Sequence, residues 1–152
     1  MPKLFTTLLV LACLLWSCSE GALYEKTYSP EGETWRHAEP FQYAFTIPDT
    51  NGRYTFYLDI THSVDYPFQN LYTKITTSYP DQEDVTDLLS LELSDDLGLW
   101  QGKCGKQYCK VRIPLQTNAR FKTAGEYALN FEQFTRRDSL PGVKSMRLKV
   151  IP

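Results

Sequence analysis

Apolar residues recur at every second position through much of this 152-residue chain, which is typical of β-strands with one buried face. The clearest segment is 54–61, in which Tyr54, Phe56, Leu58 and Ile60 alternate with residues expected on the opposite face. Clusters of Pro, Gly, Asn and Asp separate such segments and predict turns. The same alternation predicts further strands at 41–47, 71–78, 111–115, 127–131 and 146–150, and residues 23–28 are expected to form a first edge strand.

The segment 85–97 is compatible with two structures. Val85, Leu88 and Leu89 fit the stripe of an amphipathic helix, whereas residues 89–93 alternate as in a strand. Because strands are expected on both sides, we predict a strand. The chain then has about seven to nine short strands and no long helix, which predicts an all-β fold with a single antiparallel β-sandwich, jelly-roll-like or immunoglobulin-like.

The N-terminus has the layout of a secretory signal. Lys3 precedes an apolar run at 4–16, which is shorter than the ~20 residues needed to span a bilayer. Leu15 lies three residues before Cys18 and Ser17 directly precedes it, as in a bacterial lipobox. A plain signal peptide with an unrelated cysteine is the alternative. We expect a lipoprotein signal peptide at 1–17, a lipidated tether at 18–22 that begins with the lipid attachment site Cys18, and a β-sandwich domain at 23–152.

The cysteine count agrees with lipidation. Cys13 would leave with the signal peptide and Cys18 would carry lipid, so Cys104 and Cys109 would remain as a pair in a compartment that permits disulfides. Four residues separate them, a spacing that a turn between two strands can bridge. Half of a metal site is the alternative, but both histidines lie far away in the sequence. We predict a structural disulfide.

Little in the sequence indicates catalysis. There is no G-x-S-x-G, H-E-x-x-H or glycine-rich phosphate loop, and only two histidines are present. We therefore expect no enzyme activity, no cofactor, no metal and no small-molecule substrate. The net charge of −2 becomes −3 without residues 1–17, which argues against nucleic acid as a partner. Calcium binding by the acidic loop 81–87 is possible in principle, but a solvated loop is expected, and His62 is expected at a turn or on the surface.

Aromatic residues outside the predicted core rows are candidates for a contact surface. Exposed aromatic side chains on a β-sandwich can stack on sugars or bind a protein. Packing beneath loops is the alternative for each of them. The candidates for a partner or ligand surface are Tyr66, Phe68, Tyr72 and Trp100, with Tyr57 as a further residue that could be exposed.

Three stretches together resemble a known family. They are YPFQNLY at 66–72, LSDDLGLWQG at 93–102, and a C-terminal pattern of Phe121, Gly125, Tyr127, Gln133, Arg136, Leu140, Gly142 and Val143. With the lipobox and the length, they resemble the GldH gliding-motility lipoproteins of the Bacteroidetes. The chain departs from that pattern at Thr135, where the family usually has methionine, and at the Cys104/Cys109 pair.

The resemblance implies a non-enzymatic protein that is anchored in the cell envelope by a lipid such as palmitate on Cys18. It implies an accessory or scaffold role in gliding motility and in type IX secretion, with other envelope proteins as partners. Ser19 is not the aspartate that retains many lipoproteins at the inner membrane, so the outer membrane is expected. A carbohydrate-binding lipoprotein of a glycan-uptake system is the alternative, and a small hydrolase built on His37 or His62 is a third.

Overall fold

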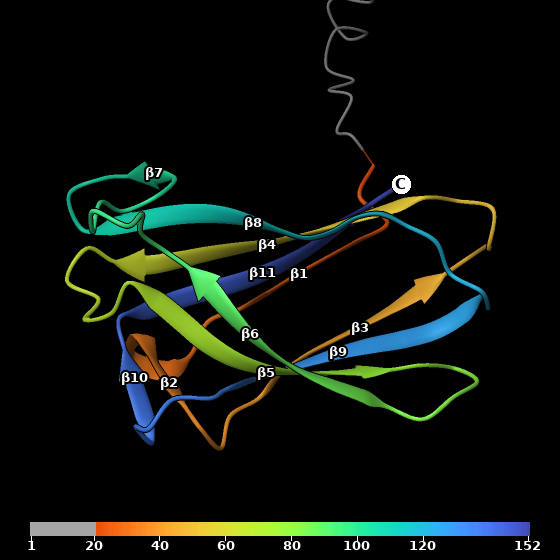
Figure 1. The fold of residues 1–152 in the computed structure, drawn as a ribbon, viewed down its shortest axis with the longest axis horizontal. Coiled ribbons are helices and arrows are strands. Elements are labelled where there is room, and N and C mark those ends of the chain that lie inside the picture. The colour runs from red at the N-terminus through yellow and green to blue at the C-terminus, as the bar shows by residue number, and fades with distance from the viewer. Residues whose placement is uncertain (1–20) are drawn as a thin grey trace, which may run out of the picture.

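The computed structural model describes residues 21–152, so Cys18 and the predicted signal peptide lie outside the described residues. The described part is an antiparallel β-sandwich, which confirms the predicted all-β class (Figure 1). None of its helices is long and apolar enough to cross a membrane.

Residues 21–152 contain more strands than the seven to nine expected, because three of the strands have only two or three residues. The strands are β1 (Tyr24–Tyr28), β2 (Thr34–Arg36), β3 (Phe41–Ile47), β4 (Tyr54–Ser63), β5 (Asn70–Ser78), β6 (Val85–Glu92), β7 (Lys103–Cys104), β8 (Tyr108–Ala119), β9 (Gly125–Gln133), β10 (Ser139–Pro141) and β11 (Val143–Ile151), with a short 3-10 turn, η2 (Glu31–Glu33), before β2.

Two sheets form the layers of the sandwich. The five-stranded sheet has the order β1-β11-β4-β8-β7, and the four-stranded sheet has the order β3-β9-β5-β6. The predicted edge strand at the start of the chain is β1, which pairs only with β11 among the described strands. The turn after β3 carries the chain from one sheet to the other, and the side chain of Asp49 accepts hydrogen bonds from the amides of Asn51 (2.9 Å) and Gly52 (2.7 Å).

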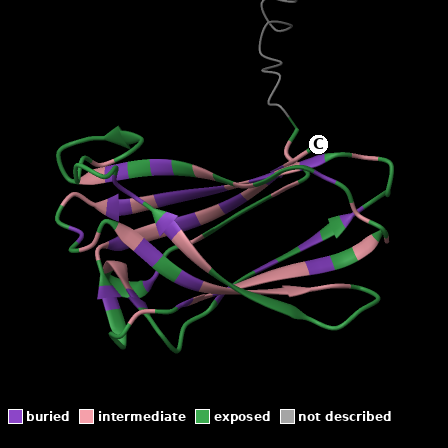
Figure 2. Ribbon diagram, in the orientation of Figure 1, coloured by how far each residue is buried: buried purple, intermediate pink, exposed green. Residues whose placement is uncertain are grey.

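The core lies between the sheets and is built from the alternating rows. On β4 the predicted inward residues are all buried, and buried and accessible positions alternate along β3 and β11 as well (Figure 2). Tyr43 of β3 donates a hydrogen bond to the carbonyl of Met146 on β11 (2.8 Å), which joins the two layers through the core. The period-two pattern of the sequence therefore fixes which face of each long strand is buried.

A two-stranded ribbon closes one end of the core. In this ribbon β2 pairs with β10, and Trp35 lies opposite Leu140. Both side chains are fully buried. The Trp35 ring stacks on Phe41 at 4.5 Å between centroids, and its Nε1 donates to the carbonyl of Glu39 (2.8 Å). These strands were missed in the sequence because three residues are too few to show alternation.

The ambiguous segment 85–97 is a strand followed by a turn, as predicted. β6 ends at Glu92, and Leu91 and Leu93 are buried. Leu88 points away from the core and is exposed, although the helical pattern would have placed it beside Leu89. Pairing with β5 therefore decides the structure of this segment.

The outer face of the five-stranded sheet contains a buried carboxylate. Asp59 of β4 is only 2% exposed, because the guanidinium groups of two flanking strands cover it. Arg112 of β8 donates from Nε (2.6 Å) and from a terminal nitrogen (2.9 Å) to its two oxygens. Arg147 of β11 donates to the same carboxylate and also to Glu25 of β1 at 2.8 Å. Asp59 and its partners thus link four neighbouring strands.

The two arginines also set the pKa of Asp59. Burial alone would raise the pKa of this carboxyl group, but the hydrogen bonds and charges of Arg112 and Arg147 outweigh burial and lower the pKa from 3.8 to about 2. The group therefore adds stability at every pH above its ordinary pKa. That contribution is lost as the pH falls from about 3.8 towards 2.

We predict that Asp59→Asn lowers the free energy of unfolding at pH 7 by about 2 kcal/mol, because hydrogen bonds to a charged acceptor are replaced by weaker ones. Urea unfolding of the mature chain measures this loss. The exposed Glu25, which contacts the same arginine, gives a matched control: Glu25→Gln should change stability by less than about 0.5 kcal/mol. Equal midpoints for Asp59→Asn and the wild type would show that the cluster does not stabilise the sheet.

Candidate functional site

The loops at one end of the sandwich form a single unit. We call residues 64–69 (between β4 and β5), 93–102 (between β6 and β7) and 105–107 (between β7 and β8) the loop end (Figure 1). The carbonyl of Gln69 accepts hydrogen bonds from the amides of Leu93 (2.9 Å) and Ser94 (3.1 Å). Segments from two different connections are therefore held together by their backbones.

A tight turn in the loop end carries two exposed leucines. The Asp95 carboxylate accepts hydrogen bonds from the amides of Leu97 and Leu99, both at 2.9 Å. Gly98 has φ +81°, a left-handed conformation that glycine adopts without a steric penalty. Leu97 is 86% exposed and Leu99 is 65% exposed. The turn, fixed by the Asp95 carboxylate, thus presents two neighbouring apolar side chains to solvent.

A row of aromatic rings runs beneath this turn. Trp100 lies 4.6 Å from His62, His62 lies 5.8 Å from Tyr66, and Tyr66 lies 5.9 Å from Phe68, all between ring centroids. The Trp100 Nε1 donates to the carbonyl of Val64 (3.2 Å). The row therefore supports the loop end from inside.

Of the four predicted surface aromatics, only Tyr72 is exposed, at 52%. Tyr66 is 4% exposed, so its prediction as a contact residue is wrong: its ring packs in the row and its hydroxyl donates to the carbonyl of Asn70 (3.3 Å). Phe68 and Trp100 are half-buried. The exposed aromatic row that sugar binding would need is therefore missing from these residues.

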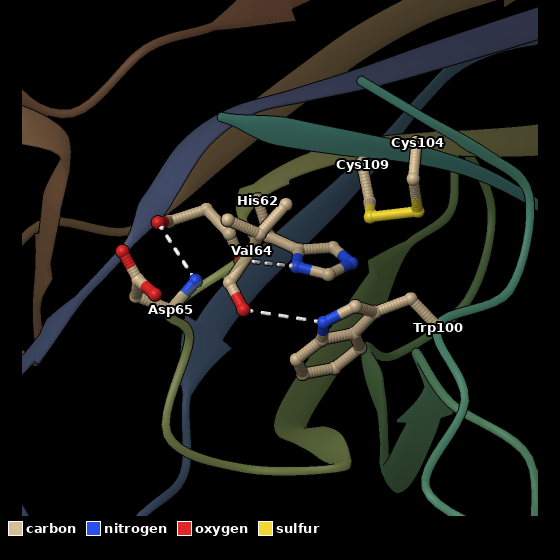
Figure 3. The surroundings of a disulfide bond; sticks show 7 residues. His62, Val64, Asp65, Trp100, Cys104 and Cys109 are labelled. Carbon is tan, nitrogen blue, oxygen red and sulfur yellow. Dashed lines mark hydrogen bonds between the residues drawn. A yellow bond between two sulfur atoms is a disulfide. The ribbon is translucent and has the colours of Figure 1, made fainter. Parts of the chain in front are cut away.

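His62 is buried, so the prediction of a turn or surface histidine is also wrong (Figure 3). It ends the inward row of β4, where alternation continues one step beyond Ile60. Its Nδ1 lies 2.9 Å from the carbonyl of Ser63, and since a carbonyl can only accept, Nδ1 carries the proton. Its Nε2 is buried and has no hydrogen-bond partner among residues 21–152. Burial lowers the pKa of this imidazole.

The predicted disulfide is present beside His62. Cys104 of β7 and Cys109 of β8 lie opposite each other in the hairpin and are bonded (Figure 3). Cys109 is fully buried and Cys104 is exposed. The bond links the two-residue edge strand β7 to β8 within the five-stranded sheet, and β7 directly follows the loop 93–102.

An apolar groove adjoins the loop end on the four-stranded sheet. It has a volume of about 840 Å³. Phe134, directly after β9, donates its amide to the carbonyl of Tyr72 (2.8 Å), which places both exposed rings on one wall. Arg137 lies 5.3 Å from the centre of the Phe68 ring. The groove thus combines apolar surface with cations; it is lined chiefly by Phe68, Tyr72, Leu88, Phe134, Arg136 and Arg137.

Strand β6 lies between this groove and a second hollow. β6 is the edge strand of its sheet, and no described strand pairs with its outer side. The second hollow, of about 540 Å³, opens between the two sheets and is lined in part by Leu89, Leu115 and Phe121. Asp87 occupies an inward position of β6 at this hollow; a charged side chain at such a position discourages unspecific strand pairing.

The comparisons with known proteins agree with this description. A sequence model of the GldH lipoprotein family matches residues 22–150. The chain belongs to the GldH lipoprotein family. A relative, the gliding motility lipoprotein GldH of Flavobacterium johnsoniae, is 22% identical over 140 residues, which cover 91% of this chain and 86% of the relative.

In this GldH-family chain, the two segments that carry much of the sequence resemblance, 66–72 and 93–102, are in contact at the loop end. The exposed leucines of the turn, Phe134 and Leu88 were not predicted as surface residues. The exposure of the two leucines could have been predicted from the sequence, because they lie in a turn rich in Asp and Gly and such turns lie at the surface. Phe134 gave no signal, since a single aromatic after a strand is usually packed.

The histidines do not lie in a catalytic arrangement. His62 contacts aromatic rings and a backbone carbonyl, and the Nδ1 of His37 lies 3.0 Å from the carbonyl of Gln133. Neither ring forms a hydrogen bond with a carboxylate of residues 21–152. In the same part of the chain, no three His, Cys, Asp or Glu side chains are grouped as metal ligands.

We predict that breaking the disulfide by Cys104→Ser lowers the free energy of unfolding by about 2 kcal/mol, because a short closed loop is released in the unfolded chain. Denaturant unfolding with and without a reductant measures this. Reductant should destabilise the wild type to a similar extent and leave Cys104→Ser unchanged. A wild type that is insensitive to the reductant would contradict the prediction.

We further predict that stability decreases as the pH falls below about 6.5, the ordinary pKa of histidine, because the unfolded chain binds a proton more readily than buried His62 does. Unfolding measured between pH 7.5 and 5 tests this. The variant His62→Phe should lack most of the slope, whereas His37→Gln should retain it. An unchanged slope in His62→Phe would assign the effect to other groups.

Proposed function

We propose that this GldH-family protein is a non-enzymatic, lipid-anchored component of the cell envelope that acts as a scaffold in gliding motility and type IX secretion. Its relative is a gliding motility lipoprotein, which supports a role in gliding. Cys18 would carry the lipid, in the outer membrane rather than the inner one. The partner would be another envelope protein of the same machinery, bound at the loop end and the apolar groove.

The observation that carries this proposal is the exposed apolar surface at the loop end. Leu97 and Leu99 are presented by a turn whose backbone is fixed by Asp95, so little conformational entropy is lost when they are covered. The neighbouring groove adds aromatic surface from Tyr72 and Phe134. Protein interfaces often combine apolar side chains held in fixed positions with neighbouring arginines.

The position of this surface also suits a scaffold. The amide of Leu23, near the tether, bonds to the carbonyl of Val150, whereas Val143, at the other end of the same strand, pairs with His62 at the loop end. Nine residues of β11 thus separate tether and loop end by roughly 27 Å. A partner held near the same membrane is at high local concentration, so a modest interface is sufficient.

We predict that Leu97→Ser combined with Leu99→Ser weakens partner binding about thirtyfold, the effect of losing an interface hot spot. Crosslinking and affinity purification from the native cells measures the recovery of gliding and secretion components. Val85→Ser is the matched control, because Val85 is an exposed apolar residue at the opposite end of β6. Its recovery should equal that of the wild type.

The variant Cys18→Ala tests the anchor in the same experiment. It should lose both membrane association and recovery of these components, while the purified domain keeps its unfolding midpoint. If the wild type recovers only glycan-uptake proteins, or no envelope protein, the scaffold proposal is wrong. If Leu97→Ser/Leu99→Ser binds normally, the partner contacts another surface.

A further inference from the structure

The outer face of the five-stranded sheet carries an excess of positive charge. Its outward positions hold five basic and two acidic residues, which gives a net charge of +3. At the loop end Lys144 and Glu33 flank the ring of Tyr108 and cancel each other. The charged residues of the face are Lys103, Lys110, Arg112, Arg147 and Lys149, with Glu25 and Asp59.

The outer face of the four-stranded sheet has the opposite sign. Glu92, Glu126 and Glu132 stand against Lys74 alone, which gives a net charge of −2. Lys74 is paired with Glu132 at 2.8 Å. The loop 81–84 adds Asp81, Glu83 and Asp84 at one end of this face, whereas Arg136 and Arg137 of the groove lie at the other end. The two faces of the sandwich therefore differ strongly in charge, although the whole chain is close to neutral.

The positive face is preorganised. Because Asp59 holds Arg112 and Arg147 in fixed positions, their guanidinium groups lie along the sheet surface, where both remain partly exposed. Lys103 and Lys110 are exposed cross-strand neighbours, and neither forms an ion pair with any residue in 21–152. Small residues, Thr27, Thr61 and Ser145, occupy several positions between these cations, and the one large ring on β4, Tyr57, lies 5.2 Å from the Arg112 guanidinium.

The tether joins the fold at the edge of this same sheet. Residues 21–23 lead directly into β1, where the amide of Leu23 bonds to the carbonyl of Val150 (2.9 Å; Figure 1). Leu23 is five positions after Cys18, a distance of at most about 17 Å when the chain is fully extended. A lipid on Cys18 would hold this sheet edge within that distance of a bilayer.

We propose that the basic face of the five-stranded sheet lies against the anionic phospholipid surface into which the Cys18 lipid inserts. This rests on the proposed lipid anchor but not on the proposed partner. Charge complementarity favours this face, and the short tether supplies proximity. The domain then lies flat on the membrane, the acidic sheet faces away from it, and the loop end is displaced sideways from the anchor.

A reconstitution experiment tests this orientation. Mature protein lipidated on Cys18 is placed in vesicles of phosphatidylcholine alone or with phosphatidylglycerol, and a fluorophore on Thr27→Cys reports quenching by headgroup-labelled lipid. Thr27 is an exposed position of the basic face, and Thr86→Cys on the other sheet is the matched probe site. Quenching should be strong at position 27 only in anionic vesicles, weak at position 86, and reduced by added salt.

Charge variants identify the residues responsible. Each basic residue near an anionic surface changes the partition constant by about fivefold, so Lys103→Gln with Lys110→Gln should lower the ratio of bound to detached domain about 25-fold. Arg120→Gln with Lys122→Gln removes the same charge from the loop after β8, where both residues line the hollow between the sheets rather than the outer face, and should leave the ratio unchanged. Unfolding midpoints confirm that both double variants are folded.

Two outcomes would overturn the proposal. Equal quenching at positions 27 and 86 in anionic vesicles would show that the domain does not lie on this face. Unchanged quenching in Lys103→Gln/Lys110→Gln would show that the contact does not depend on these charges, leaving the face free for an acidic protein. Because the experiment contains neither cells nor partner, failure here leaves the scaffold role intact, and failure of the partner experiment leaves this orientation intact.

Discussion

The structure depends on one constraint: each sheet has a single apolar face, and each covers the apolar face of the other. Strand β4 illustrates it, because its inward row lies in the core from Tyr54 to His62, while its outward row is partly accessible to solvent except at Asp59, which the two arginines cover. Burial of these rows supplies the main driving force, and the hydroxyl of Tyr43 adds a hydrogen bond across the core. The loop end can expose leucines only because this core holds its supporting strands in place.

The long strands were predictable because apolar and polar residues alternate along them. With this period of two, only one pairing register places the apolar row in the core. It could not reveal β2 and β10, which have three residues each and are defined by the pairing of Trp35 with Leu140. Asp59 and His62 show a second limit. Both follow from the position of β4 in the middle of its sheet, where neighbouring strands bury a charged residue on one face and a histidine on the other.

The candidate site was only partly predictable for a related reason. The segments 66–72 and 93–102 were recognised as a family pattern, but whether each aromatic ring points inward depends on contacts between distant loops. Tyr66 is buried with its ring packed between His62 and Phe68, whereas Tyr72 remains exposed on the outer side of β5. The disulfide was easier to predict from the sequence than the positions of the aromatic rings. Cys104 and Cys109 are close in sequence, and a local hairpin brings them together.

The place of β11 in the sheet has a consequence for biosynthesis. The last strand of the chain lies between β1 and β4, and β1 has no other described partner. The five-stranded sheet cannot be completed until residues 143–151 have been synthesised, because β1 joins the sheet only by pairing with β11. Until β11 is in place, β1 has no described partner and the four-stranded sheet has only an incomplete second layer to pack on, so completion of the core is a late step in the folding of residues 21–152.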